Sequence, residues 1–281
     1  MYDQNYPSNF GGASPLILSA MTLHSATFED RTHAAAVTGF QGIGWQFDDL
    51  LNEDATIKQS RLQLLASSGI RPLEIEFFRD WIDRSEDPSY RAQEEALFKL
   101  ANLVKARHIN VAVFKPTPQA QIVASLRALC RRAAAYRLIV QLEPMVYTPP
   151  IDSVSSAWEI IADVNEPNLG LLIDAWQWVR MDETPASLLA IPATKISSIQ
   201  LSDTLQTPIA DTVTESRHQR KIPGMGTTDV AHLLQAISKH GVHAPLSVEI
   251  MSDDLETMPV IDAAQAVAYG TREVLWNLQS L

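Results

Sequence analysis

The sequence predicts an α/β fold, a single-domain (β/α)8 barrel, and three observations support this prediction. Short apolar runs, typical of parallel strands buried on both faces, alternate eight times with segments of helical periodicity. The length of 281 residues fits one such barrel, which takes about 250 residues. No glycine-rich phosphate turn follows the first predicted strand, which disfavours the alternative of an open doubly wound sheet.

The chain is expected to divide into two parts. Residues 1–14 are rich in Gly, Ser, Asn and Pro and are expected to form an N-terminal tail or arm. Residues 15–281 are expected to form the barrel domain, because no low-complexity tract or linker within them indicates a second domain.

Local signals mark the first four strand-and-helix units. Thr27, with Asp30 three residues later, is a plausible N-cap, and the Ser-Ser-Gly sequence at 67–69 is a helix end. In the third strand acids alternate with apolar residues, so they are expected to face different sides. The predicted strands span residues 16–20, 41–45, 73–78 and 109–114, and the predicted helices span 28–38, 55–67, 90–106 and 119–136.

The last four units contain the longest irregular stretch, residues 202–226, whose Pro and Gly residues indicate a structured loop. Loops of this length inside a compact domain are usually functional. The predicted strands span residues 138–144, 169–174, 196–201 and 245–251, and the predicted helices span 154–164, 185–190, 228–240 and 260–278.

Composition excludes several classes of function. The formal net charge of −11 argues against a general nucleic-acid binder or a binder of anionic membranes, since both need a basic surface. The single cysteine, Cys130, cannot form an internal disulfide and is expected to be inert core. The first residues lack the pattern of a secretory signal, and no apolar run approaches the roughly 18 residues of a membrane span. A soluble cytoplasmic protein is expected.

Four strands carry a polar residue at or near their C-terminal ends: Glu143, Asp174, Gln200 and Glu249. In a (β/α)8 barrel these ends form one face, so three carboxylates and an amide should converge. Like charges about 4 Å apart repel by about 4 kcal/mol per pair at an effective dielectric of 20, and a divalent cation would remove that cost. An all-oxygen ligand set favours Mn²⁺ or Mg²⁺ over Zn²⁺, so one such ion is expected.

The order of several short segments makes the chain resemble a known family. It is similar to the xylose-isomerase-like TIM barrels of the sugar phosphate isomerase/epimerase superfamily, and some segments resemble its 3-dehydroshikimate dehydratase branch. The segments are Gln141-Leu142-Glu143-Pro144, Gly170-Leu171-Leu172-Ile173-Asp174, Ile199-Gln200-Leu201-Ser202-Asp203, Ser216-Arg217-His218-Gln219-Arg220, Lys221-Ile222-Pro223-Gly224-Met225-Gly226 and Ser247-Val248-Glu249.

The resemblance implies roles for particular residues. Glu143, Asp174 and Glu249 would bind a divalent metal, with Gln200 at a third ligand position where many members have histidine. Arg220 would contact an oxygen of the substrate. The resemblance also implies a homo-oligomer. One residue departs from the pattern: Gln177 stands where many members have a histidine, and glutamine cannot act as a general base.

Other candidates for substrate binding are Gln177, His218, Trp176, Lys115 and Glu76. The alternatives stay open for several of them. His218 lies in a polar loop and is more typical of a solvated residue, whereas Lys115 and Glu76 are equally consistent with the site and with the scaffold. Trp45, Trp176 and Trp178 would either wall the pocket or pack in the core. Arg217 would bind an anion or pair with a nearby acid, and His24 is a weaker candidate for the barrel mouth.

The expected chemistry is removal of a proton next to a metal-bound carbonyl of a keto sugar, a cyclitol or a related polyol, through an enediolate. Glu143 and Glu249 would exchange the proton, which predicts an isomerase or epimerase. The first alternative is a dehydratase of 3-dehydroshikimate or a keto-cyclitol, and the second is a barrel that binds without turnover. A phosphodiesterase would need a histidine-rich multi-zinc site and a basic groove, and neither is visible in the sequence.

Overall fold

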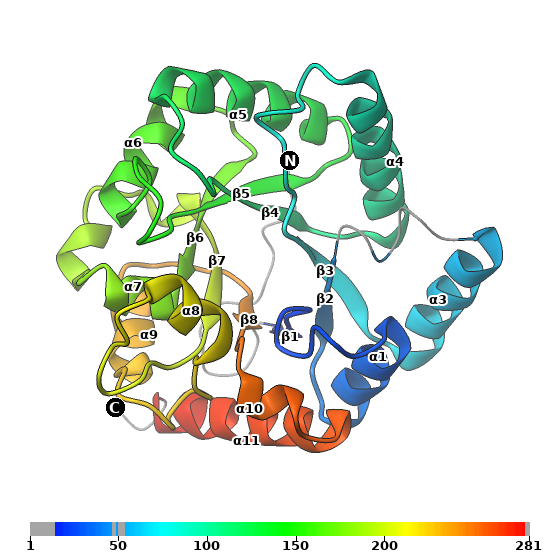
Figure 1. The fold of residues 1–281 in the computed structure, drawn as a ribbon, viewed down its shortest axis with the longest axis vertical. Helices are drawn as coiled ribbons and strands as arrows, with labels where there is room; N and C mark the ends of the chain where they lie inside the picture. The colour runs from blue at the N-terminus through cyan, green and yellow to red at the C-terminus, as the bar shows by residue number, and fades with distance from the viewer. Residues whose placement is uncertain (1–14, 47–48, 50–53, 279–281) are drawn as a thin grey trace.

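The computed structural model describes residues 15–46, 49 and 54–278, so the predicted N-terminal arm lies outside the described residues. Eight strands pair in parallel, each with its neighbours in sequence, and β8 pairs with β1 to close the barrel. The helices form a ring around it (Figure 1). The predicted fold class is therefore confirmed.

The eight strands are short and follow one another around the barrel in sequence order. They are β1 (Leu16–Leu18), β2 (Gly42–Gln46), β3 (Arg71–Glu76), β4 (His108–Ala112), β5 (Ile139–Glu143), β6 (Leu169–Asp174), β7 (Ile196–Leu201) and β8 (Leu246–Val248).

The helices of the described residues fall into two groups by position. Those of the outer ring are α1 (Phe28–Val37), α3 (Ala55–Ser68), α4 (Pro88–Val104), α5 (Gln119–Ala134), α6 (Val154–Val164), α9 (Val230–Lys239) and α11 (Val260–Leu278). Three short helices follow the strand ends: α7 (Ala175–Arg180), α8 (Thr212–His218) and α10 (Asp253–Glu256).

The predicted bounds of α6, β6, β7 and α11 are confirmed, and most others differ by a few residues. Two expectations are wrong. The stretch 202–226 is not irregular throughout, because it contains α8. Asp211 caps this helix by accepting hydrogen bonds from the N–H groups of Val213 and Thr214. The helix expected at 185–190 is a single 3-10 turn, Pro185–Leu188.

Two predicted helix ends have the expected capping chemistry. The Thr27 side chain accepts a hydrogen bond from the N–H of Asp30 at the start of α1, as predicted. At the end of α3, Gly69 has a φ of 72°, the left-handed conformation that glycine adopts without strain.

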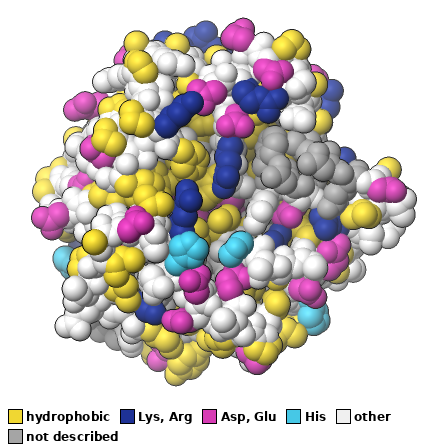
Figure 2. Space-filling model, viewed as in Figure 1, with side chains coloured by type: hydrophobic (Ala, Val, Ile, Leu, Met, Phe, Trp, Pro, Cys, Tyr) yellow, Lys and Arg dark blue, Asp and Glu magenta, His cyan; other side chains and the backbone are white. Residues whose placement is uncertain are grey.

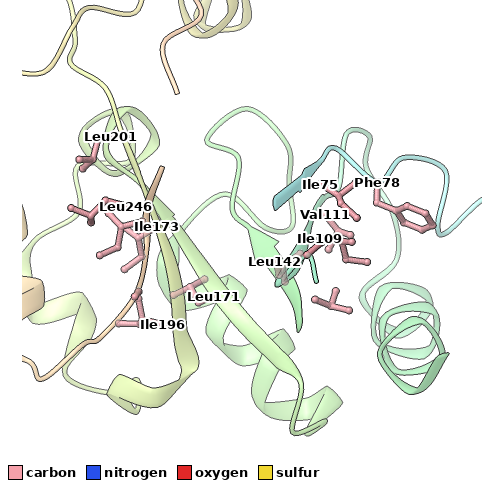
Figure 3. Close-up of a cluster of buried hydrophobic side chains, with 14 of the residues drawn as sticks. Ile75, Phe78, Ile109, Val111, Leu142, Leu171, Ile173, Ile196, Leu201 and Leu246 are labelled. Atoms are coloured by element: carbon pink, nitrogen blue, oxygen red, sulfur yellow. The ribbon is translucent and has the colours of Figure 1, made fainter. Parts of the chain in front are cut away.

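Strand residues alternate between two environments. Apolar side chains such as Ile75 and Ile109 face outward and join the buried hydrophobic cluster drawn in part in Figure 3. The alternate residues of the same strands are polar and buried, and they include Glu74 and Glu76. Because the Glu74 carboxylate accepts a hydrogen bond from Ser247 on β8, a strand that does not neighbour β3, these side chains point into the barrel.

None of the helices in the described part of the chain combines the length and the apolar character that crossing a membrane requires.

Candidate metal centre

Three buried carboxylates meet at the C-terminal ends of β5, β6 and β8. Glu143 and Asp174 are the last residues of their strands, and Glu249 follows the last residue of β8. One oxygen of each carboxylate lies within 4.8 Å of one oxygen of each of the others. The structure therefore brings these three residues together, as the strand pattern predicts.

Two of the carboxylates are held by hydrogen bonds on both oxygens. Asp174 Oδ1 accepts from the N–H of Gln177 at 2.7 Å, and Asp174 Oδ2 accepts from Arg220 Nη1 at 2.7 Å. Glu249 Oε1 accepts from Gln200 Nε2 at 3.0 Å, and Glu249 Oε2 accepts from Arg220 Nη1 at 3.0 Å. Gln200 is thus placed beside the carboxylates, with its amide group against Glu249.

Glu143 differs from the other two carboxylates. Although it is buried, neither of its oxygens accepts a hydrogen bond from any described residue, and the same holds for Gln200 Oε1. Buried oxygens without partners are unusual, because each loses its hydration without compensation. Three acceptor oxygens in this cluster are therefore available to a ligand.

Arg220 is the positive group of the cluster. Its side chain is 1% exposed, and its Nε and Nη2 donate to the carbonyl oxygen and the hydroxyl of Ser216 at 2.8 and 3.2 Å. The guanidinium carbon lies 5.4 Å from the centre of the Trp176 ring, within range of a cation–π interaction. These contacts hold Arg220 between Asp174 and Glu249, where it is a counter-charge for both carboxylates.

Burial and mutual repulsion disfavour the charged forms of the carboxylates. Burial raises the pKa of Glu143 well above its ordinary value, and the negative charges of Glu249 and Asp174 raise that pKa further. Burial also raises the pKa of Glu249 to about 8, although the Arg220 guanidinium opposes that rise.

The donor set fits a divalent cation. When ionised, the three carboxylates outnumber the single guanidinium, and the oxygens of Glu143 and Gln200 without partners suit a hard ion. Across residues 15–46, 49 and 54–278, this is the one group of three or more potential metal ligands that was found, and it contains no histidine. That composition disfavours the multi-zinc phosphodiesterase alternative.

The structure places the other candidate residues at varying depth. Glu76 is buried in the barrel, where its carboxylate accepts from the Ser19 hydroxyl at 2.7 Å and from the N–H of Ala20 at 3.2 Å. Trp176 is fully buried, and its Nε1 donates to Glu215 at 3.3 Å. Trp45 and Trp178 are buried as well.

Three candidates form exposed ion pairs instead. Lys115 Nζ lies 2.7 Å from Asp83 Oδ2, and His218 Nδ1 lies 2.8 Å from Asp253 Oδ1. His24 pairs in the same way with Glu256 at 2.8 Å. Within the described part of the chain, none of these three side chains forms a hydrogen bond or ion pair with Glu143, Asp174 or Glu249, whereas the backbone N–H of Gln177 donates to Asp174.

A small apolar cluster at the C-terminal ends of β3, β4 and β5 was not evident from the sequence. Phe77, Ala112 and Met145 form a small hydrophobic cluster separate from the main core, and Met21 and Tyr147 pack against it. The face turned to the viewer in Figure 1 carries α8 and α10, which follow β7 and β8. On this face Lys and Arg side chains lie along one part of a hollow in which hydrophobic side chains are visible, and His and acidic side chains lie below it (Figure 2).

Comparison with known proteins gives a family and several relatives. Residues 32–272 match the family model described as xylose isomerase-like TIM barrel. The chain is 27% identical over 265 residues to the 3-dehydroshikimate dehydratase of Pseudomonas aeruginosa, a match that covers 91% of the chain and 42% of the relative. The chain thus spans about two fifths of that protein's length.

Two further similarities are more partial or more distant. The inosose isomerase of Bacillus subtilis is 27% identical over 125 residues, which is 44% of each protein. The crystal structure of the IOLI protein with a bound zinc atom superposes with a TM-score of 0.79 at 19% identity, over 95% of this chain and 100% of that one. At this identity the superposition shows a shared fold.

Proposed function

The chain belongs to the xylose isomerase-like TIM barrel family, and we propose that it is a divalent-metal-dependent isomerase or epimerase of a keto sugar or related polyol. One observation carries the proposal: Glu143, Asp174 and Glu249 converge, buried, with oxygens that fit a divalent cation. Relatives named dehydratase and isomerase support an enzyme rather than a barrel that binds without turnover.

Glu143, Asp174, Gln200 and Glu249 are the residues that would hold the metal. When bound, the ion would supply positive charge that polarises a substrate carbonyl and favours loss of a proton from the neighbouring carbon. Mn²⁺ or Mg²⁺ suits the oxygen donors better than Zn²⁺ does. The bound zinc of the IOLI protein makes zinc the ion against which this preference should be tested.

Glu143 and Glu249 are the proposed acid–base residues. Burial raises the pKa of both carboxyl groups, that of Glu249 to about 8, so each holds a proton more readily than an exposed glutamate does. The two residues come from β5 and β8, which are not neighbouring strands. Return of the proton to the opposite face of the same carbon gives epimerisation, and return to the adjacent carbon gives isomerisation.

Dehydration is the second candidate reaction, and the similarity to the 3-dehydroshikimate dehydratase over 91% of the chain favours it. In that reaction the proton is removed in the same way, but a hydroxyl on the next carbon leaves as water. Arg220 and Gln177 would then serve substrate binding, since neither side chain is a suitable base at neutral pH.

Proton exchange with solvent tests the proposal. The metal-loaded protein is incubated in D₂O with inososes, keto sugars or 3-dehydroshikimate, and loss of the substrate α-proton is followed by nuclear magnetic resonance. We expect exchange that a chelator abolishes, with a rearranged sugar as product for an isomerase or an ultraviolet-absorbing aromatic product for a dehydratase. No exchange on the whole panel, with metal bound, would contradict the proposal and favour the binding barrel.

A further inference from the structure

The phenol of Tyr147 has a weak hydrogen-bond partner at the edge of the metal centre. Tyr147 lies in the loop after β5, four residues beyond Glu143, and is partly exposed. Its hydroxyl donates to Met145 Sδ at 3.3 Å. A thioether sulfur is a poor acceptor, so a charged or carbonyl oxygen would replace it with a gain in hydrogen-bond strength.

The groups around the phenol belong to the metal centre. Burial raises the pKa of Tyr147, and the Glu143 carboxylate raises it further, while the Ser216 and Gln177 side chains and the charge of Arg220 act in the opposite direction. Geometry also links the phenol to this centre, because its acceptor, Met145 Sδ, accepts from Gln177 Nε2 as well, and the Gln177 N–H donates to Asp174. Because the pKa is raised, the hydroxyl keeps its proton at neutral pH and is available as a donor.

Gln177 fixes the segment that carries this phenol. Its Oε1 accepts from the N–H of Val146 at 3.0 Å, which orients the amide so that Nε2 donates to Met145 Sδ at 3.1 Å. Its own N–H donates to Asp174. Gln177 thus connects the end of β6 to residues 145 and 146, immediately before Tyr147.

We propose that Tyr147 is a catalytic residue, an inference that rests on the proposed function. As the proton leaves the substrate carbon, the neighbouring oxygen gains negative charge, and the Tyr147 hydroxyl donates a hydrogen bond to that oxygen. Tyr147 keeps its own proton throughout, so this contact makes and breaks no covalent bond. Gln177 is the positioning residue that holds the loop. The apolar cluster against which Tyr147 packs, which contains Phe77 and Met145, helps to exclude water from this hydrogen bond and so strengthens it.

The test begins with Tyr147→Phe, which removes only the hydroxyl. The matched control is Tyr269→Phe, because Tyr269 is 64% exposed on α11 and distant in sequence from the site residues. With any panel substrate that the wild type exchanges, we expect kcat to fall by about 100-fold in Tyr147→Phe. KM and the Mn²⁺ affinity should stay within about twofold of the wild-type values, and the Tm should stay within a few degrees. Unchanged kcat would overturn the proposal.

The role of Gln177 is tested by a double-mutant cycle. Gln177→Ala should lower kcat by a similar factor, and Tyr147→Phe should lower it little further in that background, because the hydroxyl is already misplaced. Fully additive losses would contradict a positioning role. Gln177→Asn, with a shorter side chain, should not restore kcat, whereas a merely structural requirement for an amide would allow it.

A second readout separates this inference from the proposed reaction. Oxalate, a planar dianion that resembles an enediolate, is titrated into the Mn²⁺-loaded wild type and into Tyr147→Phe. We expect about tenfold weaker oxalate binding in the variant with unchanged Mn²⁺ binding. If the wild type exchanges no substrate but oxalate binds more weakly to Tyr147→Phe than to the wild type, the proposed reaction fails and the Tyr147 contact stands. Equal oxalate affinities of the two proteins would overturn the Tyr147 contact.

Discussion

Arg220 shows how one side chain determines the charge balance of the site. Its Nη1 donates to both Asp174 and Glu249, whose carboxylates lie 46 and 29 residues away in sequence. Without this guanidinium, the hydrogen-bond partners of the two buried carboxylates among the described residues would be the neutral N–H of Gln177 and the neutral amide of Gln200. Arg220 is therefore the counter-charge of two carboxylates within the protein itself.

Replacement of this cation should expose its role. We expect Arg220→Met to lower the free energy of unfolding of the metal-free protein by about 3–5 kcal/mol, because it leaves buried charge uncompensated. Mn²⁺ should restore part of the loss by supplying positive charge at the same carboxylates. Urea unfolding with and without Mn²⁺ measures both effects.

The control for this measurement is Arg131→Met. Arg131 is also paired, with Glu166, but its side chain is 68% exposed, and such pairs contribute about 0–1 kcal/mol. If Arg220→Met were no more destabilising than Arg131→Met, the interpretation of Arg220 as a buried counter-charge would be wrong.

The convergence of Glu143, Asp174 and Glu249 could be predicted because each acid lies at or near the end of an apolar run, and parallel strands bring their C-terminal ends together. The contacts that surround these three residues could not be predicted. The Arg220 contacts depend on how the loop between β7 and α9 folds back, and the Tyr147 contacts depend on a hydrogen bond from Val146 to Gln177. No local pattern encodes contacts between such loops.

At the scale of elements, Asp203 organises the loop that presents Arg220. Its Oδ1 accepts from the N–H groups of Thr204 and Thr228 at 2.8 and 2.7 Å, and its Oδ2 accepts from those of Gly224 and Gly226, both at 3.0 Å. Its backbone also pairs with Lys221, the residue after Arg220. A Cβ on Gly226 would lie 2.4 Å from Asp203 Oδ1, so this close approach requires glycine.

Loss of the Asp203 carboxylate should loosen that loop. We expect Asp203→Ala to lower the free energy of unfolding by about 3 kcal/mol, since four backbone donors lose their charged acceptor. Asp203→Asn should have a smaller effect because it keeps one acceptor oxygen. Thermal unfolding of both variants, compared with Asp254→Ala at a side chain that is 81% exposed, measures the difference. Equal Tm values for Asp203→Ala and Asp254→Ala would refute this role.

Element boundaries were predictable where a turn signal separates strand from helix, as at α6 and α11. The short helix α7 was not predicted, because it begins directly after β6 with no turn residue between them. Asp174 ends the strand and also caps the helix by accepting from the N–H of Gln177. A residue with two local roles gives a sequence pattern that neither strand nor helix rules identify.

At the scale of the whole molecule, the barrel interior is polar, whereas branched apolar residues dominate most (β/α)8 interiors. His108 Nε2 lies 3.1 Å from Glu74 Oε2, and its Nδ1 lies 3.2 Å from Arg107 Nη1. Since a guanidinium only donates, Nδ1 accepts and Nε2 carries the proton that goes to Glu74. The imidazole is therefore neutral in the folded protein.

This arrangement predicts the response of stability to pH. Burial, with the charge of Arg107, lowers the pKa of His108 well below its ordinary 6.5. Below pH 6.5 His108 becomes protonated in the unfolded chain but not in the folded chain. The contribution of His108 to stability is therefore present above that pH and is lost as pH falls. Burial raises the pKa of Glu74, which acts with the opposite sign as pH rises above its ordinary 4.5.

His108→Gln isolates the histidine contribution, because it keeps a hydrogen-bond donor but cannot titrate. Between pH 6.5 and 5.5 we expect the wild type to lose about 1 kcal/mol more stability than the variant. Urea unfolding across this range measures both slopes. If stability fell equally with pH in the wild type and the variant, His108 would not be neutral in the folded protein.

The most direct test of the central claim is titration of Mn²⁺ into chelator-treated protein by calorimetry, with wild type, Glu143→Gln and Glu95→Gln. Glu95 is an exposed acid on α4 and is the control. We predict about one Mn²⁺ per chain for wild type and Glu95→Gln, and binding weakened at least about 100-fold in Glu143→Gln, which loses a charged ligand. Wild-type affinity in Glu143→Gln would contradict the assignment of the metal centre to these strand ends.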